Sequence, residues 1–200
     1  MNNLVFYIGL GLGLALAAGL RPFFPALLAG ALASKKLLGL GFTHGHYRFL
    51  QSGWWLVVLA VVLVLAYLIQ LRLGSERFAS GPLSAAFAGI GIGIGALLFA
   101  GTLAAHGDAS WPGLIGGAAC AALSQLAVRP LLSGARTRLP DRAAREALTL
   151  YVDGAALLFA ALVALLHPLG YLLLALLVWL TMRARQRARK KYAGLRILGR

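Results

Sequence analysis

Four uncharged apolar runs constrain this chain more than any other feature of its sequence. They cover residues 4–20, 50–71, 79–105 and 109–128. Crossing the ~30 Å hydrocarbon core of a bilayer takes about 20 helical residues, so each run matches one membrane pass. A fifth run, residues 154–182, is long enough for two short passes around His167-Pro168. The sequence therefore predicts an all-α integral membrane protein.

The charge of the chain points to a membrane surface rather than to nucleic acid. The chain is 60% hydrophobic and only 12% charged, yet its net charge is +14. The basic residues lie between the apolar runs and in the terminal segment 183–200, where they act as topology signals and contact anionic lipid headgroups. We therefore expect membrane lipids, and no nucleic acid, as partners.

The chain contains an internal repeat. Glycines 9, 11, 13 and 19 align with glycines 91, 93, 95 and 101, and the segment that begins at Pro25 aligns with the one that begins at Pro112. Each half has a glycine-rich helix, a break, a helix that starts at a proline, a loop and another helix. The predicted units are residues 1–78, residues 79–167, a final span at 168–182 and a basic cytoplasmic tail at 183–200.

The positive-inside rule gives these units opposite orientations. With the N-terminus outside, of the 19 Lys and Arg residues only Lys35, Lys36 and Arg48 lie outside, and the other 16 lie in the cytoplasm. The sequence thus predicts six to seven helical segments, arranged as two inverted-topology three-segment repeats plus a C-terminal span. The C-terminus is cytoplasmic in this layout.

A proline-rich break follows the first helix at Arg21-Pro22-Phe23-Phe24-Pro25. The prolines push the preceding residues out of the α conformation, so we expect a new, re-entrant helix to begin at Pro25. Non-helical backbone inside a membrane needs a covering of protein or a water-filled cavity. The new helix N-terminus and Arg21 would together attract an anion. Alternatively, Arg21 snorkels to the headgroups and the prolines only form a tight turn.

Asp153 is the second candidate site residue, because it is an ionisable group inside an apolar run. Such groups usually face the bundle interior and are paired, and the expected partner is Arg21 or Arg72. Asp153 then has a substrate-facing or coupling role, or forms a purely structural salt bridge. Tyr67 and Gln70 would add polar lining, or would lie at headgroup level.

The place in the second half that matches the proline break contains His106 and Asp108. This break carries a carboxylate where the first carries a guanidinium. Because the two breaks would lie at opposite faces of the membrane, we interpret His106 and Asp108 as an outer gate.

The glycines are interpreted as helix-packing positions, since small residues four apart let helix backbones approach closely. Without a strand-turn-helix context they do not indicate a phosphate loop. We expect no metal, no cofactor and no catalytic constellation, and hence no enzyme. The packing candidates are Gly9, Gly13, Gly19, Gly91, Gly95 and Gly101.

The stretch Gly19-Leu20-Arg21-Pro22-Phe23-Phe24-Pro25, Asp153, Pro168 and the basic tail resemble the bacterial membrane family catalogued as domain of unknown function 4126. The resemblance implies a multi-pass protein of the bacterial inner membrane. It implies no activity, because none is assigned to the family.

These features favour a small transporter or lipid-translocating protein that handles an anionic solute or a phosphate-bearing lipid between the repeats. The alternative is an oligomeric channel or a non-transporting scaffold or assembly factor, in which the glycines build a homo-oligomer and the tail binds anionic lipids or a partner.

Overall fold

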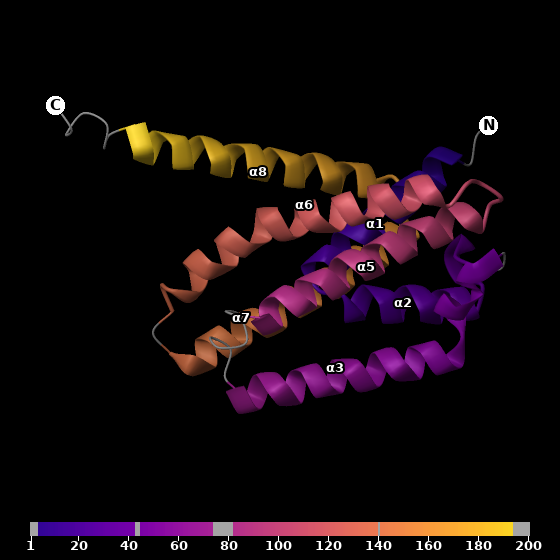
Figure 1. The fold of residues 1–200 in the computed structure, drawn as a ribbon, viewed down its shortest axis with the longest axis horizontal. Coiled ribbons are helices and arrows are strands. Elements are labelled where there is room, and N and C mark those ends of the chain that lie inside the picture. Colours follow the sequence, from indigo (N-terminus) through magenta and orange to yellow (C-terminus); the bar gives the residue numbers. More distant parts are fainter. Residues whose placement is uncertain (1–3, 43–44, 74–81, 140, 194–200) are drawn as a thin grey trace.

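The computed structural model describes residues 4–42, 45–73, 82–139 and 141–193, and these residues form helices and connections only (Figure 1). The predicted all-helical fold is confirmed. In chain order the elements are α1 (Leu4–Leu20), α2 (Phe23–Ser34), the 3-10 helices η1 (Leu37–Gly39) and η2 (Gly45–Gln51), α3 (Gly53–Leu73), α5 (Pro82–Ala104), α6 (Trp111–Arg136), α7 (Arg142–Leu165) and α8 (Leu169–Ala193).

Four of these helices are long and apolar enough to cross a membrane. Their apolar windows are Gly53–Gln70 in α3, Pro82–Ala104 in α5, Trp111–Arg136 in α6 and Ala143–Leu165 in α7. Shorter apolar helices are α1, α2 and the segment Leu169–Ala184 of α8. Large apolar side chains such as Ile115, Leu158 and Leu172 are exposed on the outside of the bundle, as expected of a multi-pass membrane protein.

Successive long helices run in alternate directions, so the connections gather at two ends of the bundle (Figure 1). One end, here called the basic end, contains the end of α3, the start of α5 and the α6–α7 connection, and the α1–α2 break lies further inside the bundle. The opposite end contains the start of α1, the η segments and the α5–α6 and α7–α8 connections. Residues 194–200 of the predicted tail lie outside the described residues, and the preceding basic segment continues α8 without a break.

Helix α1 is the centre of the bundle, and α3 lies at its periphery. α1 packs against α5, α6, α7 and α8, and it is buried from Gly9 to Gly19 except at Leu12. α3 packs mainly along α2 and η2. Only 6% of the apolar window of α3 is buried, against 28–33% for the windows of α5, α6 and α7. α3 is therefore held against the bundle by its neighbours in sequence.

Close contacts between elements account for many of the described glycines. A Cβ on Gly19 would lie 2.7 Å from the Cα of Ala121, and one on Gly95 would lie 2.8 Å from the Cβ of Ala121. A Cβ at each of the six predicted packing positions would lie 3.0 Å or less from an atom in another part of the chain. These positions are Gly9, Gly13, Gly19, Gly91, Gly95 and Gly101. Gly93 belongs to the same run, but a Cβ there would have nothing within 4 Å.

Two predicted boundaries are wrong. α2 begins at Phe23 rather than at Pro25, so Pro25 is its third residue. The first turn of a helix has no intrahelical partners for its N–H groups, so a proline there costs no hydrogen bond. α6 does not end near Val128, where the apolar run ends, but continues through Pro130 to Arg136. The sequence predicts a loop over residues 129–145, and in the structure that loop is shorter. A proline inside a helix removes one hydrogen bond, which packing against neighbouring helices can outweigh in a membrane.

Candidate functional site

The break between α1 and α2 lies inside the bundle rather than at its surface. Arg21 and Pro22 connect the two helices. The carboxylate that Arg21 meets, Asp153, is eleven residues after the start of α7, or about 16 Å along the helix axis. Tyr67, which touches the same carboxylate, is six residues before the end of α3, or about 9 Å. The break therefore opens well inside the basic ends of the surrounding helices.

Arg21, Asp153 and Tyr67 form one connected polar cluster. The Nε of Arg21 lies 2.6 Å from Oδ1 of Asp153, and the Tyr67 hydroxyl donates a hydrogen bond to Oδ2. Asp153 is only 5% exposed, so both of its oxygens are satisfied away from solvent. Of the two partners considered for Asp153, the structure brings Arg21 to it. Arg72 lies exposed in the last turn of α3.

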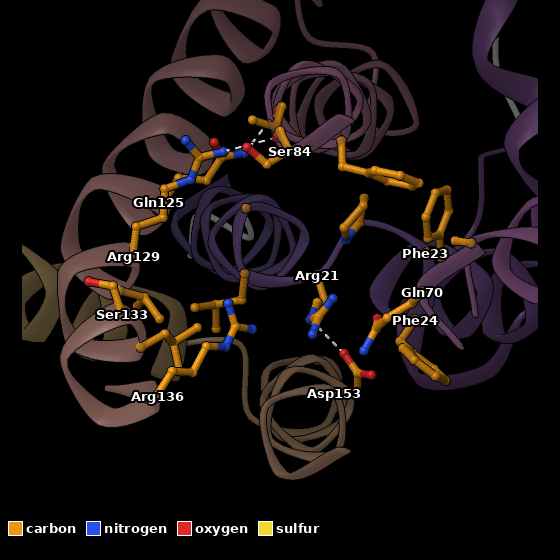
Figure 2. Close-up of a pocket in the computed structure, with 18 of the residues that line it drawn as sticks. Arg21, Phe23, Phe24, Gln70, Ser84, Gln125, Arg129, Ser133, Arg136 and Asp153 are labelled. Carbon is orange, nitrogen blue, oxygen red and sulfur yellow. Dashed lines mark hydrogen bonds and ion pairs between the residues drawn. The ribbon is translucent and has the colours of Figure 1, made fainter. Parts of the chain in front are cut away.

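A cavity of about 920 Å³ surrounds this cluster. Figure 2 shows Arg21 and Asp153 pointing toward each other, with Arg136 of α6 on one side of them and Phe23 and Phe24 on the other. Of the other predicted site residues, Pro22, Tyr67 and Gln70 line the cavity, whereas Pro25 is buried in α2. The volume is at the upper end of the usual range for ligand pockets, about 300–1,000 Å³.

The two sides of the cavity differ in chemistry. The α6–α7 side is polar and basic, with Gln125, Arg129, Ser133, Arg136, Thr137, Arg145 and Asp153. The side formed by α2, α3 and α5 is mostly apolar, with Phe23, Phe24, Leu63, Ala66, Phe87 and Ala88. A cavity divided in this way suits a ligand with a charged end and an apolar end.

Positive charge exceeds negative charge in the lining. Four arginines and one aspartate contribute, which gives a formal excess of three positive charges. Arg129 donates to the carbonyl of Ser84, and Arg145 to that of Leu139. Arg136 differs from these two, because its Nε is buried and has no hydrogen-bond partner among the described residues. The positive charge of Arg21 also acts on Arg136.

This electrostatic arrangement is unfavourable in the absence of a ligand. Buried polar groups are nearly always hydrogen-bonded, and one left without a partner costs free energy. Like charges that face each other across a cavity add to that cost. An anion between Arg21 and Arg136 would relieve both, because guanidinium groups donate paired, charge-assisted hydrogen bonds to phosphate and carboxylate.

Arg129, Arg136 and Arg145 were not predicted as site residues from the sequence, which placed them in a cytoplasmic loop. A usable signal was present: residues 125, 129, 133 and 136 are polar and are spaced by four, four and three. That spacing places them on one face of a continuous helix. The uncharged run ends at Val128, before the charged Arg129, so the prediction of a membrane pass from apolar length stops short of this face.

The proposed outer-gate residues lie at the opposite end of the bundle from this cavity. His106 and Asp108 are exposed in the connection between α5 and α6. The His106 ring stacks on Tyr7, and its Nδ1 lies 2.8 Å from the carbonyl oxygen of Thr102. Nearby, burial lowers the pKa of His167, and the charge of His106 lowers it further. The described residues contain no cluster of three or more metal-ligating side chains.

Comparisons with known proteins assign the chain to a family but not to an activity. The sequence model of the family described as "Domain of unknown function (DUF4126)" matches residues 8–187, and the chain belongs to that family. No curated protein and no solved structure matches the chain.

Proposed function

We propose that this member of the DUF4126 family is a small transporter or lipid-translocating protein that binds an anionic substrate in the cavity beside Arg21. One observation carries the proposal: Arg136, whose buried Nε has no hydrogen-bond partner among the described residues, lines the same cavity as Arg21. Ionisable groups at membrane depth are costly and usually functional. A site that is electrostatically strained when empty is adapted to bind the charge that it lacks.

In this proposal the residues of the site have separate roles. Arg21 and Arg136 bind the anion from two sides, and Arg129 and Arg145 contribute positive charge to the polar side of the cavity. Asp153 holds Arg21 through its Nε, which leaves the other two guanidinium nitrogens available to a ligand. Tyr67 keeps the carboxylate in place through its hydroxyl. Gln70 contributes a further polar group to the lining.

The packing of the two halves supports a transport cycle. In the proposed inverted repeat, α1 of the first half corresponds to α5 of the second. These helices run antiparallel, since Ala15 lies beside Gly95 and Ala18 beside Gly91. The small residues at these two positions let the backbones of α1 and α5 approach closely, and transporters built from inverted repeats move one half against the other around the site.

The proposed orientation follows the positive-inside rule. The basic end faces the bacterial cytoplasm and contains the cavity, while the opposite end, with His106 and Asp108, faces outward. The basic segment of α8 then lies at the inner surface, where anionic lipids are available to it.

The proposal is tested by flux measurements on the full chain in proteoliposomes. Arg136→Gln removes one anion-binding charge, and Arg138→Gln removes an exposed charge two residues away that is not among the residues lining the cavity. We expect Arg136→Gln to reduce transport of radiolabelled phosphate or of fluorescent phosphatidic acid at least tenfold, and Arg138→Gln to leave it unchanged.

The stability of Arg136→Gln separates a binding role from a packing role. Because the change removes the repulsion from Arg21, the variant should be as stable as the parent protein in detergent, or more so. Loss of the folded protein would assign Arg136 to packing. Unchanged flux in a folded variant would refute the proposed function and favour a non-transporting scaffold.

A further inference from the structure

The apolar side of the cavity depends on the least embedded long helix. α3 packs along α2 and η2, whereas its contacts with α5 and α7 are sparse. Leu63 and Ala66 of α3 nevertheless face the cavity, as do Phe87 and Ala88 of α5. The side of the cavity between α3 and α5 is thus lined by apolar groups and held by few interhelical contacts.

A second hollow lies on the other flank of α3. It has a volume of about 280 Å³ and is lined by Tyr67 and Gln70 of α3 and by Glu146, Ala147, Thr149 and Leu150 of α7. α3 is therefore flanked by free volume toward both α5 and α7. Such a helix can yield sideways without disrupting the core around α1.

Aromatic rings bound the apolar side of the cavity at the level of the α1–α2 break. Phe23 of α2 meets Phe87 of α5 edge-to-face, with ring centroids 5.9 Å apart, and Phe24 meets Tyr67 in the same manner at 6.5 Å. These contacts bridge α2 to α5 and to α3 at the level of the break. The apolar space therefore extends from the Arg21 cluster toward the membrane flank of α3 and α5.

Resting on the proposed function, we infer that the substrate is a lipid with a phosphate monoester head, and that it enters sideways from the inner leaflet between α3 and α5. The head lies between Arg21 and Arg136, and the acyl chain lies along Leu63, Ala66 and Phe87. A phosphate monoester carries up to two negative charges, which suits the excess of three positive charges in the lining. A free anion would contact the basic side of the cavity but would leave the apolar side without any contact to the ligand.

The experiment compares three probes that separate the head from the chain. They are 1-oleoyl lysophosphatidic acid, lysophosphatidylcholine of the same chain, and glycerol 3-phosphate, each added to the purified full chain in detergent, with binding measured by native mass spectrometry. We expect lysophosphatidic acid to bind roughly tenfold or more tightly than lysophosphatidylcholine, because its phosphate lacks the choline cation. It should bind roughly a hundredfold or more tightly than glycerol 3-phosphate, because the chain is buried.

Two matched pairs of variants locate the head and the chain. Arg136→Gln should weaken lysophosphatidic acid binding roughly tenfold, and Arg138→Gln should not. Ala66→Phe fills the apolar side and should weaken binding of this lipid at least tenfold while sparing glycerol 3-phosphate. Val64→Phe is the control, since Val64 lies on the outside of the same helix and is 56% exposed.

A photoreactive label on the acyl chain of the lipid tests the entry path in the unmodified protein, so the result does not depend on whether a variant folds. Lysophosphatidic acid with a diazirine in its acyl chain should label peptides of α3 or α5 in the unmodified protein. Labelling confined to α6 and α8 would overturn the inferred entry path.

The outcomes distinguish this inference from the function on which it rests. If glycerol 3-phosphate binds as tightly as lysophosphatidic acid and Ala66→Phe has no effect, the substrate is a free anion. The lipid inference then fails, while anion transport stands. If none of the three probes binds and flux is indifferent to Arg136→Gln, the proposed function itself fails.

Discussion

Replacing Arg21 by alanine should destabilise the protein more than replacing its partner Asp153. The two side chains differ in exposure, since Asp153 is almost completely buried and the Arg21 side chain is 24% exposed. Arg21→Ala therefore leaves a buried carboxylate with only the Tyr67 hydroxyl as partner. Asp153→Ala leaves a guanidinium that still faces the cavity.

The expected magnitudes follow from this difference in burial. Removing one member of a buried ion pair costs about 3–5 kcal/mol, and the partial exposure of Arg21 and the remaining hydrogen bond from Tyr67 favour the lower limit. A change of about 3 kcal/mol lowers the melting temperature of a chain of this size by roughly 6–12 °C. For Asp153→Ala we expect about 1–2 kcal/mol, because water can solvate the unpaired guanidinium.

The assay is a double-mutant cycle by thermal unfolding of the purified protein in detergent. If the cost of Arg21→Ala comes from the unpaired carboxylate, the double variant Arg21→Ala/Asp153→Ala should melt at a higher temperature than Arg21→Ala alone. If the destabilisation of the double variant equals the sum of the two single destabilisations within about 0.5 kcal/mol, the two residues do not interact. The reasoning would also be refuted if Asp153→Ala were the more damaging single change.

Three further predictions concern packing, topology and pH. Gly117→Ala should lower the melting temperature, because the new Cβ would lie 2.8 Å from the Cα of Ala96. Gly93→Ala, whose Cβ would have nothing within 4 Å, should leave the free energy of unfolding unchanged or raise it by up to about 1 kcal/mol. In a Cys120→Ala background, Ser52→Cys and Ser110→Cys should react with a membrane-impermeant maleimide from the same face of the membrane, and labelling from opposite faces would contradict the topology. The lowered pKa of His167 means that the unfolded state binds more protons near pH 6.5, so stability should fall as pH drops through about 6.5. His167→Gln should flatten that pH profile, measured as melting temperature against pH.

Much of the fold could be predicted from the sequence because apolar length is a strong signal in membrane proteins. The run at residues 4–20 coincides with α1, and the prolines after it end the helix where expected. The sequence narrowed the partner of Asp153 to Arg21 or Arg72, since an ionisable group inside a membrane needs a partner, and the structure selects Arg21. The hydrogen bond from the Tyr67 hydroxyl to Asp153 depends on where α3 lies relative to α7, which only the three-dimensional structure gives.

Apolar length alone does not predict the basic side of the cavity, because that side depends on how far α6 continues beyond the uncharged run that ends at Val128. Local rules end a helix near a proline such as Pro130. In the structure α6 continues through Pro130 to Arg136, and that extension brings Arg136 to the cavity that Arg21 also lines. The apolar side of the cavity could not be predicted either. It depends on how few contacts α3 makes with other helices, and a run of leucines and valines does not indicate which tertiary contacts a helix makes.

The cavity and the proline break have a common physical origin. α2 has only 12 residues and begins deep inside the bundle, whereas α6, its counterpart in the proposed internal repeat, has 26. Between the start of α2 and the basic end, the space flanked by α3, α5 and α7 therefore lacks a helix. A second full-length helix there would fill the cavity and remove the protected site in which Arg21 and Arg136 face each other. The shortened helix thus creates the volume, and the extended one supplies the charge that faces it.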